Sequence, residues 1–208
     1  YKDILLEYEN FKNRNKFLIC NNSNINGKSF DLLSARDCKQ EFNFQIEKSY
    51  EGKRFESTYQ NSNQIIIMIG NKTCSQKDKE YLPLKILESH LSYGMSSVLF
   101  KLFREKNGLT YDVGIFNPIR KNNIPFLIYL SVSNKNALLA FEILCELWGK
   151  LLTSMVSEKE IRLAKEKLKN SFLFSNQSIE EIFLRKIQLV SYDLKPNFDK
   201  IFLSKIKK

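Results

Sequence analysis

The order of hydrophobic and polar residues along the chain predicts a group of strands in its middle part. Residues 65–69 form a continuous apolar run flanked by Asn63 and Gly70, a pattern typical of a strand at the centre of a sheet. Further strands are predicted at residues 16–20, 110–118 and 125–132. Residues 42–50, in which Phe42, Phe44 and Ile46 alternate with polar residues, are expected to form a strand or an extended connector.

Apolar residues at helical spacing predict several helices around these strands. The predicted helices cover residues 3–12, 30–41, 78–93, 96–107, 134–152, 157–174 and 182–194. In the fifth of them, one stripe is expected to face the sheet, and it consists of Leu138, Phe141, Cys145, Trp148 and Leu152. Strands gathered in the middle and helices packed on one face predict a two-layer α+β fold with a mainly antiparallel sheet.

Residues 94–111 carry the most informative local signals, and they read GMSSVLFKLFREKNGLTY. Ser96 or Ser97 can cap the start of a helix, because a hydroxyl accepts a hydrogen bond from a free N–H of the first turn. Gly108 follows the last turn and is expected to adopt the left-handed conformation that ends a helix. The segment therefore predicts a helix, a structural turn at Gly108 and a strand in direct succession.

Arg104 and Tyr111 stand seven residues apart, one on each side of this turn. Guanidinium and phenol groups both donate hydrogen bonds, so they can bind a peptide carbonyl or the oxyanion that replaces it during hydrolysis. The alternative is structural: an Arg whose aliphatic part packs at a helix end and a Tyr in the core. On the two residues alone, the structural role is favoured.

The segment 94–111 resembles the second half-repeat of the insulinase and mitochondrial-processing-peptidase family of zinc metallopeptidases. That pattern is Gly-Met-Ser-Ser-Arg-Leu-Phe followed by Arg-Glu-Lys-x-Gly-Leu-x-Tyr. The resemblance implies that Arg104 and Tyr111 reach across a closed chamber to a substrate held at the zinc of the other half. It therefore favours a substrate-binding role for both residues. The chain departs from the pattern at Val98, where the family commonly has Arg, so an ionic contact there is not expected.

The resemblance extends more weakly over most of the chain and implies a domain organisation. Residues 1–50 are expected to form a connector with the helix and strand that close the preceding half. Residues 51–208 are expected to form the C-terminal, inactive peptidase domain. Under this comparison the chain starts inside the connector and stops before the last helix and strand of the family.

Family members that cut peptides carry a His-x-x-Glu-His zinc motif in a different half-repeat. This chain contains one histidine, His90, and cannot build that motif. His90 comes at the end of a predicted helix and is expected to cap it or to lie at an interface. The chain is therefore predicted to hold no metal and no cofactor, with zinc in the partner half, and to have no peptidase activity on its own.

The net charge of +10 raises the question of a nucleic-acid partner. The basic residues are spread along almost the whole chain and form no stripe, so no nucleic acid is expected. A basic surface that favours acidic peptides or proteins is a lesser alternative. No apolar run approaches the roughly 20 residues that span a bilayer, and the first residues do not resemble a signal peptide, so no membrane association is expected.

The cysteines of the chain are widely spaced and form no Cys-x-x-Cys pair, which argues against a zinc ribbon. Cys145 lies on the apolar stripe of its helix and is expected in the core. The other three, Cys20, Cys38 and Cys74, fit a soluble protein in a reducing, cytoplasm-like compartment. Spacing alone leaves a disulfide between Cys20 and Cys38 open.

Three functional hypotheses remain. The first is a non-catalytic domain that supplies Arg104, Tyr111 and chamber wall for a peptide substrate to a zinc-bearing half, in the same chain or in a partner subunit. The second is a degenerate relative that serves as a scaffold or assembly subunit. The third is an unrelated basic binding domain, which conflicts with the intact motif. The presence of both Arg104 and Tyr111 favours the first, and a second copy of the chain is a further candidate partner.

Overall fold

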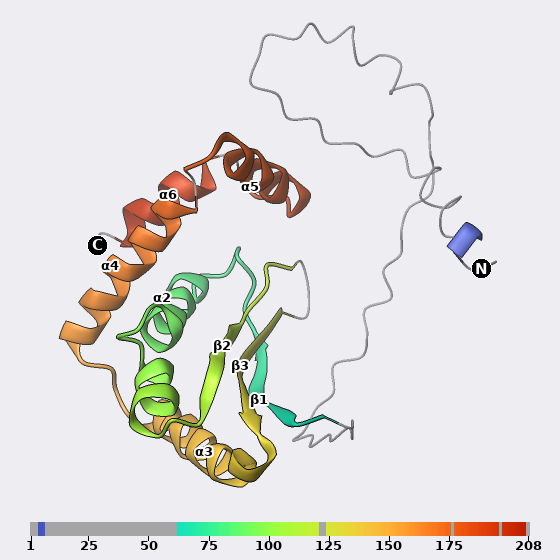
Figure 1. Cartoon of the computed structure of the whole chain (residues 1–208). Helices are drawn as coiled ribbons and strands as arrows, with labels where there is room; N and C mark the ends of the chain where they lie inside the picture. The colour runs from blue at the N-terminus through green and yellow to red at the C-terminus, as the bar shows by residue number, and fades with distance from the viewer. Residues whose placement is uncertain (1–3, 7–61, 121–123, 176, 196, 207–208) are drawn as a thin grey trace, which may run out of the picture.

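The structure is a computed structural model that describes residues 4–6, 62–120, 124–175, 177–195 and 197–206 (Figure 1). Residues 4–6 are helical, inside the first predicted helix. Several predictions lie outside the described residues and stay predictions: the strands at 16–20 and 42–50, the helix at 30–41, the domain boundary after residue 50, and the states of Cys20 and Cys38.

Three strands form an antiparallel sheet in the order β1-β3-β2. β1 covers Gln64–Thr73, β2 covers Thr110–Phe116 and β3 covers Ile124–Ser133. β3 lies between the other two strands, and every second side chain along it is buried. The predicted antiparallel sheet is thereby confirmed, and so are the strands predicted at residues 110–118 and 125–132.

The apolar run at residues 65–69 lies in β1, but β1 is an outer strand of the described sheet and not its centre. Ile67 and Ile69 pair with buried residues of β3 and pack against the core. Ile66 and Met68 lie on the opposite face and are 66% and 57% exposed. The predicted central position was wrong because a continuous apolar run does not require burial on both faces.

The helices cover one face of the sheet, as Figure 1 shows. α2 (Tyr81–Ser92) and the π-helix η2 (Phe100–Lys106) connect β1 to β2. After β3 come the short 3₁₀ turn η3 (Asn134–Asn136), α3 (Ala137–Thr153), α4 (Glu158–Phe174), α5 (Ile179–Ser191) and α6 (Phe198–Ile206). α2, η2 and α3 contact the strands, whereas α4 packs on α2 and α6 packs on α4. The predicted α+β fold with helices on one face is confirmed.

Local sequence signals explain the starts of two helices, and their weakness explains why one helix was not predicted. Ser157 and Ser178 begin α4 and α5 with capping boxes, in which each Ser hydroxyl accepts a bond from the backbone N–H three residues later. α5 therefore begins before residue 182, the predicted start. α6 was not predicted, because its buried residues Phe202 and Ile206 form only one helical repeat. None of the described helices is both long and apolar enough to cross a membrane.

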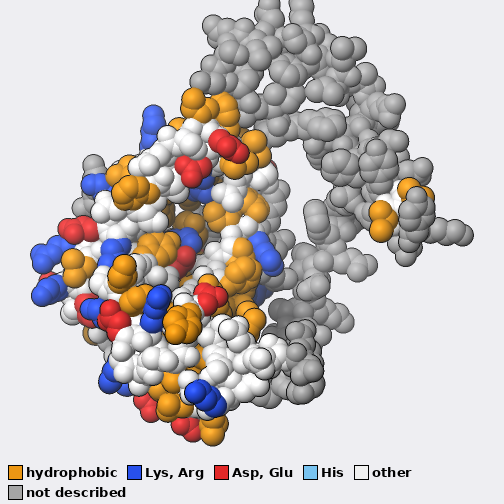
Figure 2. Space-filling view, viewed as in Figure 1, with side chains coloured by type: hydrophobic (Ala, Val, Ile, Leu, Met, Phe, Trp, Pro, Cys, Tyr) orange, Lys and Arg blue, Asp and Glu red, His pale blue; other side chains and the backbone are white. Residues whose placement is uncertain are grey.

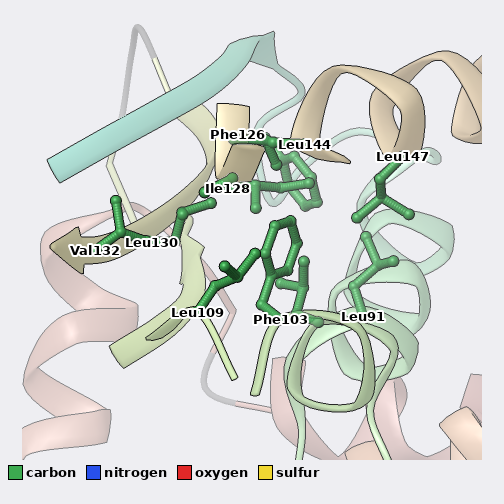
Figure 3. Packing of buried hydrophobic residues seen from close by; sticks show 11 residues of the cluster. Leu91, Phe103, Leu109, Phe126, Ile128, Leu130, Val132, Leu144 and Leu147 are labelled. Carbon is green, nitrogen blue, oxygen red and sulfur yellow. The ribbon is translucent and has the colours of Figure 1, made fainter. Parts of the chain in front are cut away.

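The main hydrophobic core lies between the sheet and the helices that cover it (Figure 3). Phe103 of η2 is completely buried. Figure 3 shows its ring directed toward Ile128 of β3 and Leu144 of α3, with Leu91 of α2 beside it. Because a buried aromatic ring contributes a large contact area, Phe103 fixes η2 on the sheet.

The buried face of α3 differs from the predicted stripe. The residues that enter the core are Ala140, Leu144 and Leu147. The predicted stripe is largely exposed: Leu138 (71%), Phe141 (40%), Cys145 and Leu152 (75%). Trp148 packs only partly against the core, and Cys145 is not a core thiol. Both stripes are apolar at helical spacing, so the pattern alone cannot choose the face that meets the sheet.

Two Leu→Ala substitutions on α3 test this assignment. Leu144→Ala should lower the free energy of unfolding by about 2–5 kcal/mol, because it removes buried methyl groups and leaves a cavity. Leu138→Ala, the matched control on the exposed face, should change it by less than about 0.5 kcal/mol. Urea unfolding followed by circular dichroism measures both. Equal losses in the two variants would show that α3 is buried on both faces.

Candidate functional site

Residues 94–111 form the helix, turn and strand predicted from their sequence. The Ser97 carbonyl accepts a 3.1 Å hydrogen bond from the backbone four residues later, so helical bonding begins there. η2 has the wider turns of a π-helix, a form frequent at functional sites. Gly108 ends it with a φ of 59°, in the left-handed region, and the Leu109 N–H donates to the Phe103 carbonyl at 2.8 Å.

A β-bulge at the start of β2 separates Tyr111 from the regular strand pairing. Thr110 pairs with Val132 and Asp112 pairs with Ser131, which leaves Tyr111 as the extra residue. The buried Thr110 hydroxyl holds the bulge. It accepts a bond from the Asp112 N–H (3.1 Å), and its one proton lies within reach of two carbonyls, that of Asp112 (2.8 Å) and that of Ser131 on β3 (2.5 Å). Sequence reasoning missed Thr110, whose one signal is a hydroxyl-bearing residue directly before the Tyr.

The turn brings Arg104 and Tyr111 together at the surface. The guanidinium carbon of Arg104 lies 5.9 Å from the centre of the Tyr111 ring and 5.0 Å from the centre of the Phe100 ring. These distances are typical of cation–π contacts. Tyr111 is 91% exposed, and Arg104 is exposed as well. The two residues singled out in the sequence thus form one surface group.

The structure contradicts a purely structural role for Tyr111, whereas the position of Arg104 agrees with such a role in part. A Tyr that is 91% exposed does not lie in the core. The packing of Arg104 on Phe100, in contrast, is what a side chain lying along its own helix would show. Toward the residues that the structure describes, neither the guanidinium nor the Tyr111 hydroxyl makes a hydrogen bond or an ion pair. Within the described part of the chain, the donors of both groups therefore have no acceptor.

The residues that the structure describes form no zinc site. A catalytic zinc normally has three protein ligands. Among the described residues, no three His, Cys, Asp or Glu side chains are grouped so that they could hold a metal ion. His90 is the one histidine of the sequence, and the described thiols, Cys74 and Cys145, are free.

His90 lies in the last turn of α2, where this helix packs on α4. The neighbouring Ser89 hydroxyl, which is buried, donates a 2.9 Å bond to the Ala164 carbonyl of α4. Burial lowers the pKa of His90 below its ordinary value of 6.5, Glu160 opposes that shift, and Lys167 adds to it. The imidazole is therefore a half-buried group at a helix–helix contact.

Comparison with protein families matches residues 23–168 to the peptidase M16 inactive domain. The chain belongs to this family. A protein from Rickettsia felis named as an uncharacterized zinc protease is 37% identical over 87 residues, which make up 41% of this chain and 21% of that protein. A zinc protease of the same description from Rickettsia bellii is 34% identical over 87 residues. The match spans about a fifth of the length of these curated relatives.

Solved structures of other M16 inactive domains share the fold. The inactive domain from Pseudomonas fluorescens has a TM-score of 0.63 at 22% identity, over 71% of this chain and 35% of that chain. An inactive peptidase domain from Bordetella parapertussis has a TM-score of 0.61 at 10% identity, over 73% of this chain and 83% of that chain. The family resemblance inferred from residues 94–111 is confirmed, and an unrelated basic binding domain is excluded.

Gly108 can be tested by adding a single methyl group. Gly108→Ala should lower the free energy of unfolding by about 1–2 kcal/mol, because a Cβ strains the left-handed conformation. Gly149→Ala in α3 is the matched control: neither glycine has an atom within 4 Å of the added Cβ, but φ is positive at Gly108 and not at Gly149. The control should gain up to about 1 kcal/mol from helix propensity. Thermal or urea unfolding of both variants checks this, and equal tolerance would contradict the assigned turn.

The lowered pKa of His90 predicts a pH dependence of stability. As the pH falls, His90 binds a proton in the unfolded chain at a higher pH than it does in the folded chain. The stability that the neutral His90 contributes to the folded state is therefore present above the ordinary pKa of 6.5 and is lost as the pH falls below it. His90→Gln should therefore lose less stability than the wild type when the pH is lowered from about 7.5 to about 5.5. Urea unfolding at several pH values measures the two slopes. Parallel slopes would show that His90 has the same proton affinity in both states.

Proposed function

We propose that this M16 inactive domain binds a peptide substrate through Arg104 and Tyr111, while a zinc-bearing half carries out the hydrolysis. That half belongs either to a longer chain that includes this domain or to a partner subunit of the same family. The observation that supports the proposal most strongly is the surface pairing of Arg104 with a Tyr111 that is 91% exposed. Exposure on this scale serves no packing purpose within the described part of the chain.

The chemistry of the pair suits a peptide carbonyl. Hydrolysis places negative charge on the carbonyl oxygen, and prearranged hydrogen-bond donors stabilise that charge more than they stabilise the substrate. A guanidinium offers five N–H donors and a phenol offers one O–H donor. Within this chain, Thr110 and the left-handed Gly108 act as positioning residues, because they fix the bulge and the turn between the two donors.

The open face of the sheet supports the proposed role as a chamber wall. Its exposed apolar side chains come from both outer strands: Ile66 and Met68 of β1 and Phe116 of β2, at 66%, 57% and 43% exposure. No described helix packs on this face. Exposed apolar patches on a folded domain commonly mark a contact surface, here one for extended peptide.

The central test is Tyr111→Phe in the full protein, assembled with its zinc-bearing half. The substitution keeps the ring and removes only the donor. It should lower kcat for peptide cleavage by about 10²–10³-fold with a smaller effect on KM, because the lost bond is strongest in the transition state. Single-turnover and steady-state kinetics on one peptide substrate measure this split.

Tyr192→Phe serves as the matched control. It also removes a hydroxyl, one that donates a 2.6 Å bond to the Ile119 carbonyl, so it should reduce stability by about 1 kcal/mol without changing kcat. The isolated 208-residue chain, assayed in parallel, should show no chelator-sensitive cleavage.

Wild-type turnover in Tyr111→Phe would leave the pair without a substrate role. Loss of assembly in Arg104→Ala together with a silent Tyr111→Phe would favour the scaffold hypothesis instead.

A further inference from the structure

A cavity of about 410 Å³ lies among α2, α4, α5 and α6, and none of its lining residues belongs to η2 or β2. The face of the molecule shown in Figure 2 is hollowed between α5 and α2, with hydrophobic side chains along the hollow. The volume falls within the range of roughly 300–1,000 Å³ that is usual for small-molecule sites. The Arg104 and Tyr111 group does not use this cavity.

Aromatic rings form much of the cavity wall. The Phe202 ring has three aromatic neighbours, with centroid distances of 5.8 Å to Tyr81, 6.2 Å to Phe172 and 6.1 Å to Phe198. Leu168 of α4 and Leu184 of α5 extend this apolar surface. Such a wall favours a flat, apolar ligand, since aromatic rings gain energy from offset or edge-to-face contact.

Two cations on the cavity wall are already paired within the protein. Lys85 lies 2.6 Å from a carboxylate oxygen of Glu88. Arg185 makes a two-pronged contact with Asp199, at 2.7 Å from Nη2 and 3.1 Å from Nε. All four side chains are at most 21% exposed. A charged ligand would have to compete with these pairs while losing its own hydration, so the wall favours an uncharged one.

Glu181, an acidic residue on the cavity wall, also has hydrogen-bond partners within the protein. Its carboxylate accepts bonds from the Ser178 N–H and hydroxyl, both at 3.2 Å, in the capping box that begins α5. The carboxylate therefore has its own donors within the protein. It offers no reason for a cationic ligand to enter.

Tyr81 supplies the polar feature of the cavity. It is 91% buried, since only 9% of its surface is exposed, and it lines the cavity. Its hydroxyl makes no hydrogen bond to any residue that the structure describes. Burial raises the pKa of Tyr81 to about 12, so the hydroxyl keeps its proton and remains a donor. Because Tyr81 lines the cavity, its hydroxyl can donate to an oxygen of a ligand bound there.

We propose that this cavity binds an uncharged aromatic molecule that carries one hydrogen-bond-accepting oxygen. The aromatic part packs against Phe202 and its neighbouring rings, and the oxygen accepts a hydrogen bond from the Tyr81 hydroxyl. The site is independent of the peptide-binding role of Arg104 and Tyr111, so a result that contradicts one proposal leaves the other unaffected.

Three small probes on the whole, isotope-labelled chain test the proposal through amide NMR titrations. Acetophenone has the ring and the accepting oxygen, toluene lacks the oxygen, and benzoate is charged. Acetophenone should bind saturably and shift amides around the cavity, and benzoate should bind more weakly. Tyr81→Phe should weaken acetophenone binding by roughly 3–10-fold and leave toluene unchanged, as expected for one neutral hydrogen bond.

Ser171→Trp provides the second variant. Ser171 lines the cavity from an exposed position on α4, so a Trp there fills the space without entering the core. It should abolish the binding of acetophenone and toluene, and circular dichroism should show an intact fold. Absence of saturable acetophenone binding, tighter binding of benzoate, unchanged affinity in Tyr81→Phe, or full binding in Ser171→Trp would each overturn the proposal.

Discussion

Burial of one face of β3 is the constraint on which the rest of the fold depends. Its alternate side chains, from Ile124 to Val132, are all buried, and β3 pairs with β1 on one side and β2 on the other. Phe103 and α3 pack on that same face (Figure 3). A one-residue slip of β3 would turn this apolar set toward the open face, so the register is strongly fixed. The surface that carries Arg104 and Tyr111 takes its position from this register.

Local chemistry made much of the fold predictable from sequence. The stop at Gly108 and the helix starting at Ser157 depend on neighbouring residues alone, and both occur where the sequence indicates. The burial of α3 and the place of β1 in the sheet could not be predicted in the same way. Each presents apolar side chains on two faces, and only packing against other elements of the fold decides which face is buried.

For the candidate site, too, the sequence predicted the residues but not all of their geometry. The spacing of Arg104 and Tyr111 and the family pattern around them were sufficient to select both residues, and the structure places them side by side. The bulge held by Thr110 and the wide turns of η2 were not foreseen. These irregularities arise where one element meets another, so a single run of sequence carries little trace of them.

The two irregularities on either side of Gly108 also bear on how this segment can change during evolution. Removing one residue from η2 would change its turns and move Arg104 around the helix axis, away from Tyr111. Removing one from the start of β2 would abolish the bulge and turn Tyr111 toward a different face. A side-chain replacement such as Val98 disturbs neither geometry. Lineages of this domain should therefore accept substitutions between residues 94 and 111 far more readily than insertions or deletions.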